Sequence, residues 1–212
     1  MRRVSGLCGI SLIACLVMFA ACTPATTAGV PSRCTARGPS VDLHGCNLSF
    51  ANLSYANLSY ANLSGANLYG ANLYGASLNG VNLSHANLDT AYLNLVDLTG
   101  ADLSWSTMAY VNMFDAKLTS AILFNVTLRN ASVSGSDFVD ANLHGANLTA
   151  TDLSIANLSR ANLTGSLLIA AKLDRTNLFE ADLTGATLFG ASWSHTTCPN
   201  GVVQSTECPR TH

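Results

Sequence analysis

Large apolar residues recur at every fifth position along most of the chain. From Leu43 to Trp193 the spacing never changes, which gives 31 centres, and 26 of these are leucine. The other five are Met108, Met113, Val133, Phe138 and Trp193. The residue two places before each centre is small, and the residue between is Asn or Asp in 20 of the 31 groups. A helix repeats every ~3.6 residues and a strand every ~2, so the pattern predicts neither.

A chain that turns a corner after each group of five satisfies this pattern. Four such groups close one turn, and the central leucine and the small residue point inward on every side. Backbone groups then pair between turns stacked about 4.8 Å apart, as neighbouring strands do. The period therefore predicts an all-β solenoid in which each group of five forms a quarter-turn.

Groups such as "ANLSG", "ADLTG" and "ANLTG" match the pattern A(D/N)LXX, and on these groups the chain resembles the pentapeptide-repeat family. The resemblance implies a right-handed quadrilateral parallel β-helix over residues 41–195, with about eight coils and a length of roughly 37 Å. An open solenoid end exposes its core and an unpaired edge. We therefore expect residues 34–45 to cap the N-terminal end and residues 196–212 the C-terminal end.

The N-terminus has the order of a secretory signal peptide. Arg2 and Arg3 precede an almost wholly apolar run from Leu7 to Ala21. This run is shorter than the roughly 20 residues that span a bilayer as a helix. A basic start followed by a short apolar segment and small residues is typical of a signal peptide, which we predict over residues 1–21. A transmembrane anchor is the alternative.

The end of this run, "MFAAC", resembles the lipobox of bacterial lipoproteins. Ala20 and Ala21 match, and Cys22 occupies the position that receives the lipid. Phe19 departs from the pattern, because Leu, Val or Ile is usual there, so ordinary cleavage, for example after Ala28, stays an alternative. Residues 22–33 are rich in Thr, Pro and Ala and are predicted to be a flexible tether. We expect an exported protein at the cell membrane, or free in the periplasmic or extracellular space.

Four further cysteines lie in two close pairs at the ends of the repeats. An exported chain meets an oxidising compartment, where disulfides form. Sequence distance favours Cys34 with Cys46 and Cys198 with Cys208 among the three pairings that four cysteines allow. Buried free thiols are the alternative. Zinc is less favoured, because neither pair has the short spacing of a CxxC motif.

Composition narrows the classes of function. Charged residues make up 10% of the chain and the net charge is −2, so no basic surface points to nucleic acid. Three histidines, His44, His85 and His144, fall on one side of the predicted coil, in different coils and at least about 10 Å apart. That separation is too large for a shared metal or a general acid–base pair. We expect no catalytic residue, no metal site and no cofactor.

The family resemblance raises a second function. Some cytoplasmic pentapeptide-repeat proteins protect DNA gyrase from quinolones, with rods that resemble duplex DNA in size and charge. A duplex carries one charge per roughly 1.7 Å of axis. Here Asp42, Asp102 and Asp182 share a side, but Asn or Ile holds the places between them. A gyrase-binding DNA mimic is the alternative function, and the low charge and the signal peptide oppose it.

An apolar cluster is predicted on the outer surface. Trp105, Ile122 and Phe124 fall on one side in neighbouring coils, and such clusters can mark an interaction site. Ordinary surface aromatics are the alternative, and Met108 and Met113 nearby are expected to fill the core. The sequence favours a non-catalytic, lipid-anchored envelope scaffold or protein-interaction module with an unknown protein partner. A homodimer is permitted and not required.

Overall fold

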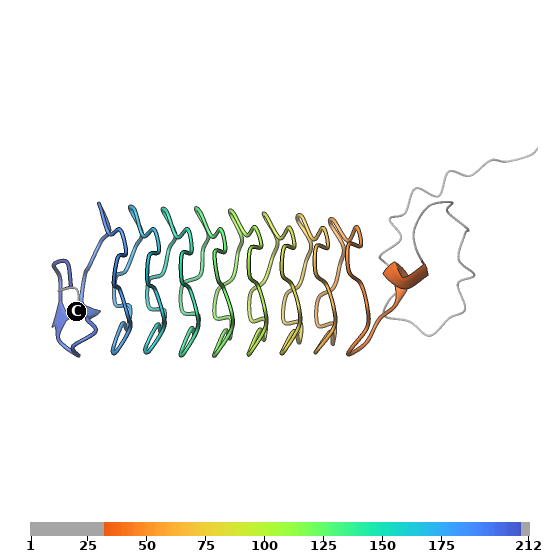
Figure 1. Cartoon of the computed structure of the whole chain (residues 1–212), viewed down its shortest axis with the longest axis horizontal. Helices are drawn as coiled ribbons and strands as arrows, with labels where there is room; N and C mark the ends of the chain where they lie inside the picture. The colour runs from red at the N-terminus through yellow and green to blue at the C-terminus, as the bar shows by residue number, and fades with distance from the viewer. Residues whose placement is uncertain (1–31, 209–212) are drawn as a thin grey trace, which may run out of the picture. The chain divides into compact units, whose positions relative to one another are not determined.

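A computed structural model describes residues 32–208 of the chain. Within this range the regular elements are a 3₁₀ helix, η1 (Ser32–Thr35), and two short antiparallel strands, β1 (Thr196–Thr197) and β2 (Val203–Gln204). Between η1 and β1 the chain winds through a series of stacked coils (Figure 1). The repeats therefore form the body of the fold, and the regular elements lie at its two ends.

Part of the sequence prediction concerns residues that the structure does not describe. The expected signal peptide at 1–21, the lipidation at Cys22 and residues 22–31 of the expected tether lie outside the described residues. Among residues 32–208, no helix is both long and apolar enough to cross a bilayer.

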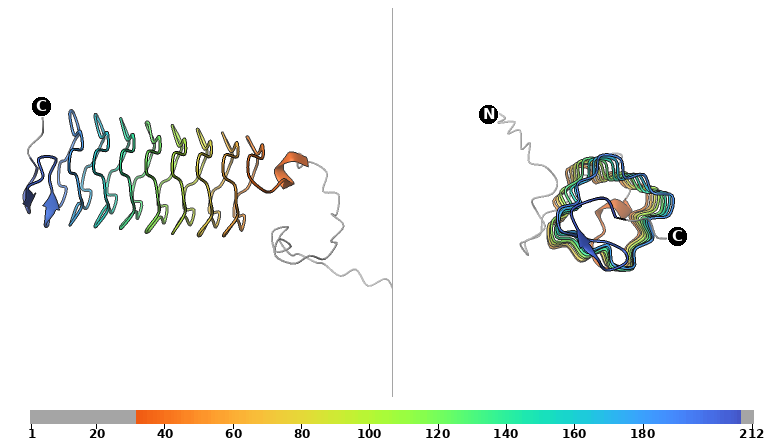
Figure 2. Two further views of the ribbon diagram at one scale, coloured as in Figure 1. Left: turned by 90° about the horizontal axis from the view of Figure 1, so that it is seen from below. Right: turned by 90° about the vertical axis from the view of Figure 1, so that its left-hand side faces the viewer.

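Residues separated by four pentads in the sequence lie side by side in adjacent coils. Isolated parallel bridges join them in an unbroken series, from Asp42 with Asn62 to Asn177 with Thr197. Four pentads therefore complete one coil, and the view along the axis shows a four-sided outline (Figure 2).

We number the sides by their first pentads. Side 1 begins with residues 41–45, side 2 with 46–50, side 3 with 51–55 and side 4 with 56–60, and each side recurs once in every coil. Residues at the same place of one side in successive coils form a column. Sides 1 and 3 are opposite each other, because two corners separate them.

Backbone hydrogen bonds explain why the period is five. The N–H of the central Leu63 donates to the carbonyl of Asn82 in the next coil at 2.7 Å, and Asn62 N–H donates to Val41 in the coil before at 2.8 Å. The corner closes when Ala66 N–H donates to the carbonyl of Leu63 at 3.0 Å. Each pentad thus pairs its backbone with both neighbouring coils and with itself, as buried polar groups require.

The Asn or Asp before each centre stabilises the corner that follows. The side-chain oxygen of Asn52 accepts two hydrogen bonds from Ser54, one from its backbone N–H at 3.2 Å and one from its hydroxyl at 2.8 Å. The same contact recurs in pentads of all four sides, for example at Asn62 and Asn147. Asn and Asp side chains favour turns through such bonds to the backbone two residues on, which explains their place in the repeat.

The core consists of the four columns of centres, which line the axis of the rod. All described centres are buried, and Met108 and Met113 are fully buried among the leucines, as the sequence predicted. Several small inward positions carry hydroxyl residues instead of alanine. Each of these donates to a backbone carbonyl: Ser106, Ser136, Thr151, Ser166, Thr176 and Thr196. Hydroxyls are therefore tolerated inside because they are hydrogen-bonded.

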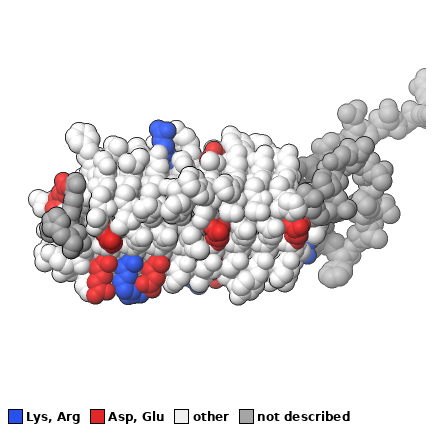
Figure 3. Space-filling model, viewed as in Figure 1, with Lys and Arg blue, Asp and Glu red and all other residues white. Residues whose placement is uncertain are grey.

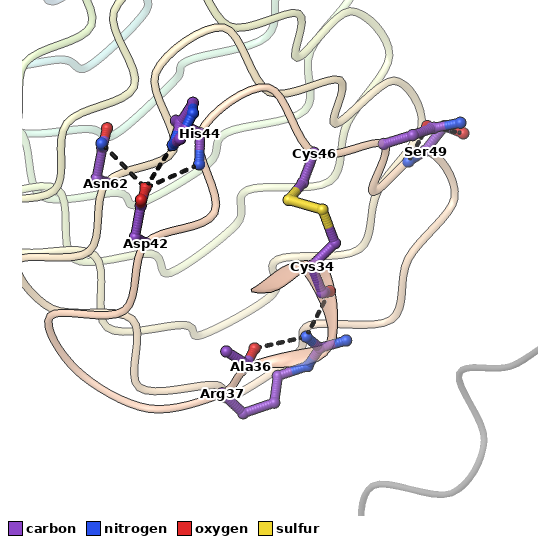
Figure 4. The surroundings of a disulfide bond; sticks show 9 residues. Cys34, Ala36, Arg37, Asp42, His44, Cys46, Ser49 and Asn62 are labelled. Carbon is purple, nitrogen blue, oxygen red and sulfur yellow. Dashed lines mark hydrogen bonds and ion pairs between the residues drawn. A yellow bond between two sulfur atoms is a disulfide. The ribbon is translucent and has the colours of Figure 1, made fainter. Parts of the chain in front are cut away.

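The N-terminal end is joined to the first coil by a disulfide. Cys34, in η1, is bonded to Cys46, which occupies a small inward position of the second pentad (Figure 4). The guanidinium of Arg37 donates to the carbonyls of Cys34 and Ala36 at 3.2 and 2.6 Å. Partial burial lowers the pKa of Arg37 from its ordinary value.

The C-terminal end continues the repeat further than expected. The residues after 195 keep the pattern, since Thr196 fills an inward small position and Cys198 a central one, both fully buried. The N–H of Leu178 donates to the carbonyl of Thr197 at 2.8 Å, so residues 196–200 complete one more side. Cys198 is bonded to Cys208, and β2 returns the chain against β1.

Candidate functional site: a ring ladder on side 1

Four ring side chains form a continuous series across side 1. His85 and Trp105 are stacked with ring centroids 6.4 Å apart and an interplanar angle of 2°. Trp105 meets Phe124 edge to face at 5.6 Å, and Phe124 is stacked on His144 at 5.3 Å. We call these four residues the ring ladder. It crosses four consecutive coils, and ring pairs at such distances attract each other beyond the area that they bury.

The repeat places the ladder in two neighbouring columns. His85 and Trp105 occupy the corner position, where the backbone is left-handed with φ of 58° and 61°. Phe124 and His144 occupy the position one residue earlier in their pentads. The ladder therefore changes column between Trp105 and Phe124, since the residue in the column of Trp105 in the next coil is Asn125.

The ladder is exposed and joined to polar neighbours at one end. Trp105 keeps 53% of its surface accessible, and Phe124 is half-buried beside it. The Nδ1 atom of His144 lies 2.6 Å from the Thr164 hydroxyl, which holds the last ring of the ladder. An apolar surface with polar ends is typical of an interaction site.

Ile122 lies on the same side, in the column where Asn or Asp usually stands. It bridges Asp102 in the coil before and Asn142 in the coil after, and 43% of its surface is accessible. The three residues predicted as an interaction patch are therefore all exposed or half-exposed on side 1, and two of them, Trp105 and Phe124, are in contact.

The histidines of side 1 have separate surroundings. His44 is paired with Asp42, with 2.8 Å between Nδ1 and Oδ1 (Figure 4), whereas His85 and His144 belong to the ladder. The sequence predicted His85 and His144 as separate surface histidines, whereas in the structure each is stacked on another ring. The available signal was that an aromatic or histidine side chain recurs once per coil along this stretch of side 1. Within residues 32–208, no group of three His, Cys, Asp or Glu could hold a metal ion.

Charged side chains are few and partly neutralised. Arg160 donates to both carboxylate oxygens of Asp140, at 2.7 and 2.8 Å, across adjacent coils of side 4. These hydrogen bonds and the positive charge hold the pKa of Asp140 below its ordinary value. On side 3, the Nζ atom of Lys172 lies 3.3 Å from Oδ2 of Asp152 in the preceding coil, and the two form an ion pair. The pairs interrupt any continuous acidic surface on those two sides.

The surface of side 3 has a shallow hollow of about 380 Å³, lined by Gly70, Asn72, Tyr74, Tyr92 and Asn94. Its walls are aromatic rings and amide groups, with no titratable acid or base among the lining residues other than tyrosine.

The stacked four-sided coils, with leucines directed inward on all four sides, define a repeat solenoid of the β-helix type. The model of the family described as pentapeptide repeats matches the chain in 8 copies, over residues 46–84, 76–113, 121–154 and 156–192. These matches cover well over half of the chain, and the chain belongs to the pentapeptide-repeat family.

Several solved structures are similar to the chain. HetL, a pentapeptide repeat protein involved in heterocyst differentiation regulation from Nostoc sp. strain PCC 7120, is 32% identical over 77% of this chain and 78% of its own, with a TM-score of 0.44. A pentapeptide repeat protein from the thylakoid lumen of Arabidopsis thaliana is 31% identical over 58% and 74%, with a TM-score of 0.25.

A trypsin-treated variant of QnrB1, a plasmid-mediated fluoroquinolone resistance protein, is 16% identical over 75% of this chain and 90% of its own, with a TM-score of 0.57. At that identity the likeness concerns the fold alone. No match was found among curated proteins.

Proposed function

We propose that the protein is a non-catalytic scaffold of the cell envelope that is exported, anchored by a lipid on Cys22, and binds a protein partner through the ring ladder. The rod has about eight coils, and the two disulfides close its ends. The observation that carries the proposal is the ladder itself, four adjoining rings at the surface of side 1.

The anchoring part of the proposal is supported by the sequence. A basic start, the apolar run from Leu7 to Ala21 and "AAC" precede the first described residue. Both disulfides fit a chain that folds in an oxidising compartment, because thiols stay reduced in the cytosol. The low charge of the rod suits a spacer that must not attract nucleic acid.

Fractionation of cells tests the anchor. Wild type and Cys22→Ala are expressed side by side, and the intact mass of each mature chain is measured. We expect wild type in the membrane fraction with the mass of a diacylglyceryl cysteine, and Cys22→Ala released or left unprocessed. An uncleaved wild-type chain in the cytosol would refute both export and anchoring.

Photo-crosslinking in intact cells tests the ladder. A photoreactive amino acid replaces Trp105 in one variant and Tyr110 in the control, since both are exposed corner residues of the same coil. We expect a discrete crosslinked protein from position 105 that the Phe124→Ser substitution removes. Equal crosslinking from positions 105 and 110 would show that the ladder is not the binding surface.

A DNA mimic that binds gyrase is the second candidate, because the chain belongs to the pentapeptide-repeat family, in which such proteins occur. The net charge of −2 opposes it, because a duplex of similar length carries one charge per roughly 1.7 Å. Purified protein added to a gyrase supercoiling assay distinguishes the two. Inhibition at stoichiometric concentration would favour the mimic, and we expect none.

A further inference from the structure

Side 3 of the first three coils carries an aromatic surface that the ring ladder does not include. Its members are the exposed or half-exposed side chains on this side and its bounding corners: Phe50, Tyr55, Tyr69, Tyr74, Tyr92 and Leu95. We call it the aromatic side. Phe50 and Tyr55 keep 69% and 73% of their surface accessible, and the shallow hollow between Tyr74 and Tyr92 lies within it.

Glycines in the second coil fix the rings at the corners. The rings of Phe50 and Tyr55 lie against Gly70 and Gly75, and a Cβ at either glycine would come within 2.8 Å of the ring. Tyr69 and Tyr74 then meet the same two rings edge to face, at centroid distances of 5.4 and 5.5 Å. The outward rings are therefore held in place before any partner arrives, which reduces the entropy that binding costs.

Four of the six members of the aromatic side, all except Tyr92 and Leu95, belong to a stretch of the chain without charge. No Asp, Glu, Lys or Arg occurs from Leu43 to Leu88, and 11 of the 12 acidic residues lie at Asp89 or beyond. Charged side chains on the face in Figure 3 are densest toward the C-terminal end. Between Cys22 and Val41 the only charged residues are Arg33 and Arg37, both basic. This end of the rod suits an anionic lipid surface, and the other end is repelled by it.

The proposed lipid on Cys22 would bring this end of the rod to a bilayer. If Cys22 carries a lipid, the segment from Cys22 to Ser32 can reach at most about 35 Å, the length of a fully extended chain. The first coils are then confined close to the headgroups, at an effective concentration in the millimolar range that short linkers give. Tyrosine rings with an apolar body and a polar tip are enriched at that interface.

From these observations we propose that the aromatic side docks on the headgroup layer of the phospholipid bilayer that holds the lipid of Cys22. The inference rests on the anchor proposed above and adds which surface of the rod meets the membrane. The rod is tilted, with side 3 of its first coils on the lipid and its charged coils held away.

Quenching by brominated phospholipid tests the docking. The full chain, expressed with its own signal peptide in a bacterial host, is reconstituted into phosphatidylglycerol vesicles that contain dibromo-phosphatidylcholine. Tyr55→Trp reports on the aromatic side, and Leu95→Trp is a second reporter in the same column. Trp105 shows that the corner position accepts tryptophan.

Two control variants are matched to the reporters. Ile155→Trp lies in the column of Tyr55 but five coils further on, and Ser64→Trp lies on side 1 of the second coil, in the column where Phe124 shows that an aromatic ring fits. We expect about two-fold more quenching of Tyr55→Trp and Leu95→Trp than of either control, because interfacial rings reach the lipid.

The outcomes separate the docking from the anchor. If every variant floats with the vesicles and quenching is equal at all four positions, the docking is wrong, whereas the lipid anchor is supported. Stronger quenching at Ser64→Trp or Ile155→Trp than at Tyr55→Trp would do the same. If the wild-type chain does not float with the vesicles, the proposed lipid anchor is wrong, and the docking, which depends on it, is wrong as well. Saturable binding of a soluble glycan at the hollow, without quenching by lipid, would assign the surface to a sugar ligand and overturn the docking.

Discussion

The coil formed by residues 121–140 contains two unusual centres side by side. Val133 is smaller than the usual leucine and Phe138 is larger, and both are fully buried. The four centres of a coil meet at the axis, so a large side chain on one side needs space from its neighbour. Interiors are packed as densely as organic crystals. We therefore predict that Val133 and Phe138 compensate each other in volume.

The predicted effects follow from the atoms that change. Phe138→Leu removes three carbon atoms from the axis and should destabilise the rod by about 2 kcal/mol, at ~0.8 kcal/mol per buried carbon. Val133→Leu adds one carbon to a filled axis and should cost about 1–3 kcal/mol. The double variant restores the leucines that most other coils have and loses a net two carbons, so at the same ~0.8 kcal/mol per carbon it should cost about 1.6 kcal/mol, less than the two single changes together.

Guanidinium unfolding followed by circular dichroism measures each variant, and the coupling is taken from the double-mutant cycle. We expect a favourable coupling of more than ~1 kcal/mol, which is typical of residues in contact. A distant pair, Phe138→Leu with Leu63→Val, should be additive within about 0.5 kcal/mol. If the Val133–Phe138 pair is as additive as this control, the volume argument is wrong.

Three further results are expected. Ser136→Ala should destabilise the rod by about 1–3 kcal/mol, because it leaves a buried backbone N–H and a buried carbonyl unpaired, and hydrogen exchange should show that N–H opening first. The pKa of Asp140 is lowered by Arg160, so the pair stabilises the fold above the ordinary carboxyl pKa and is lost as pH falls through the lowered value; NMR titration of Arg160→Gln should return the Asp140 pKa to its ordinary range. Reduction of the Cys198–Cys208 bond removes a loop constraint from the unfolded chain and should cost about 3 kcal/mol, measured as a lower guanidinium midpoint.

The fold could be predicted from the sequence because the period of five constrains every turn. Each pentad repeats three features that the fold explains. The central leucine and the small residue two places earlier point inward, and the Asn or Asp between them stabilises the corner. The prediction stopped one side early, at residue 195, because Cys198 and Thr196 stand where Leu and Ala usually do. In the structure the hydroxyl of Thr196 donates to the carbonyl of Leu173 at 2.6 Å, which makes it an acceptable inward residue.

The ring ladder was predicted only in part, for a geometric reason. Residues in one column are found by counting four pentads along the chain, and this places His85 with Trp105. The contact between Trp105 and Phe124 joins two columns, and rings can cross between them because aromatic side chains are longer than the spacing of the coils, about 4.8 Å. The sequence predicted Trp105 and Phe124 on one side, but His85 and His144, which stand in the same two columns, were predicted as separate surface histidines. Only side-chain geometry shows that their rings touch the other two.

The two proposed surfaces are compatible because the coil has four sides. The ring ladder lies on side 1 and the aromatic side on side 3, and a planar membrane that meets side 3 leaves side 1 directed away from the lipid. The repeat keeps the centre large and apolar and the residue two places earlier small, whereas the other three positions vary, since Asn or Asp precedes only 20 of the 31 centres. Large aromatic residues at these variable positions form groups on two opposite sides, and no charged residue occurs from Leu43 to Leu88. A rod that only separated two points would need neither feature, whereas a rod that lies on a membrane and presents a partner surface needs both.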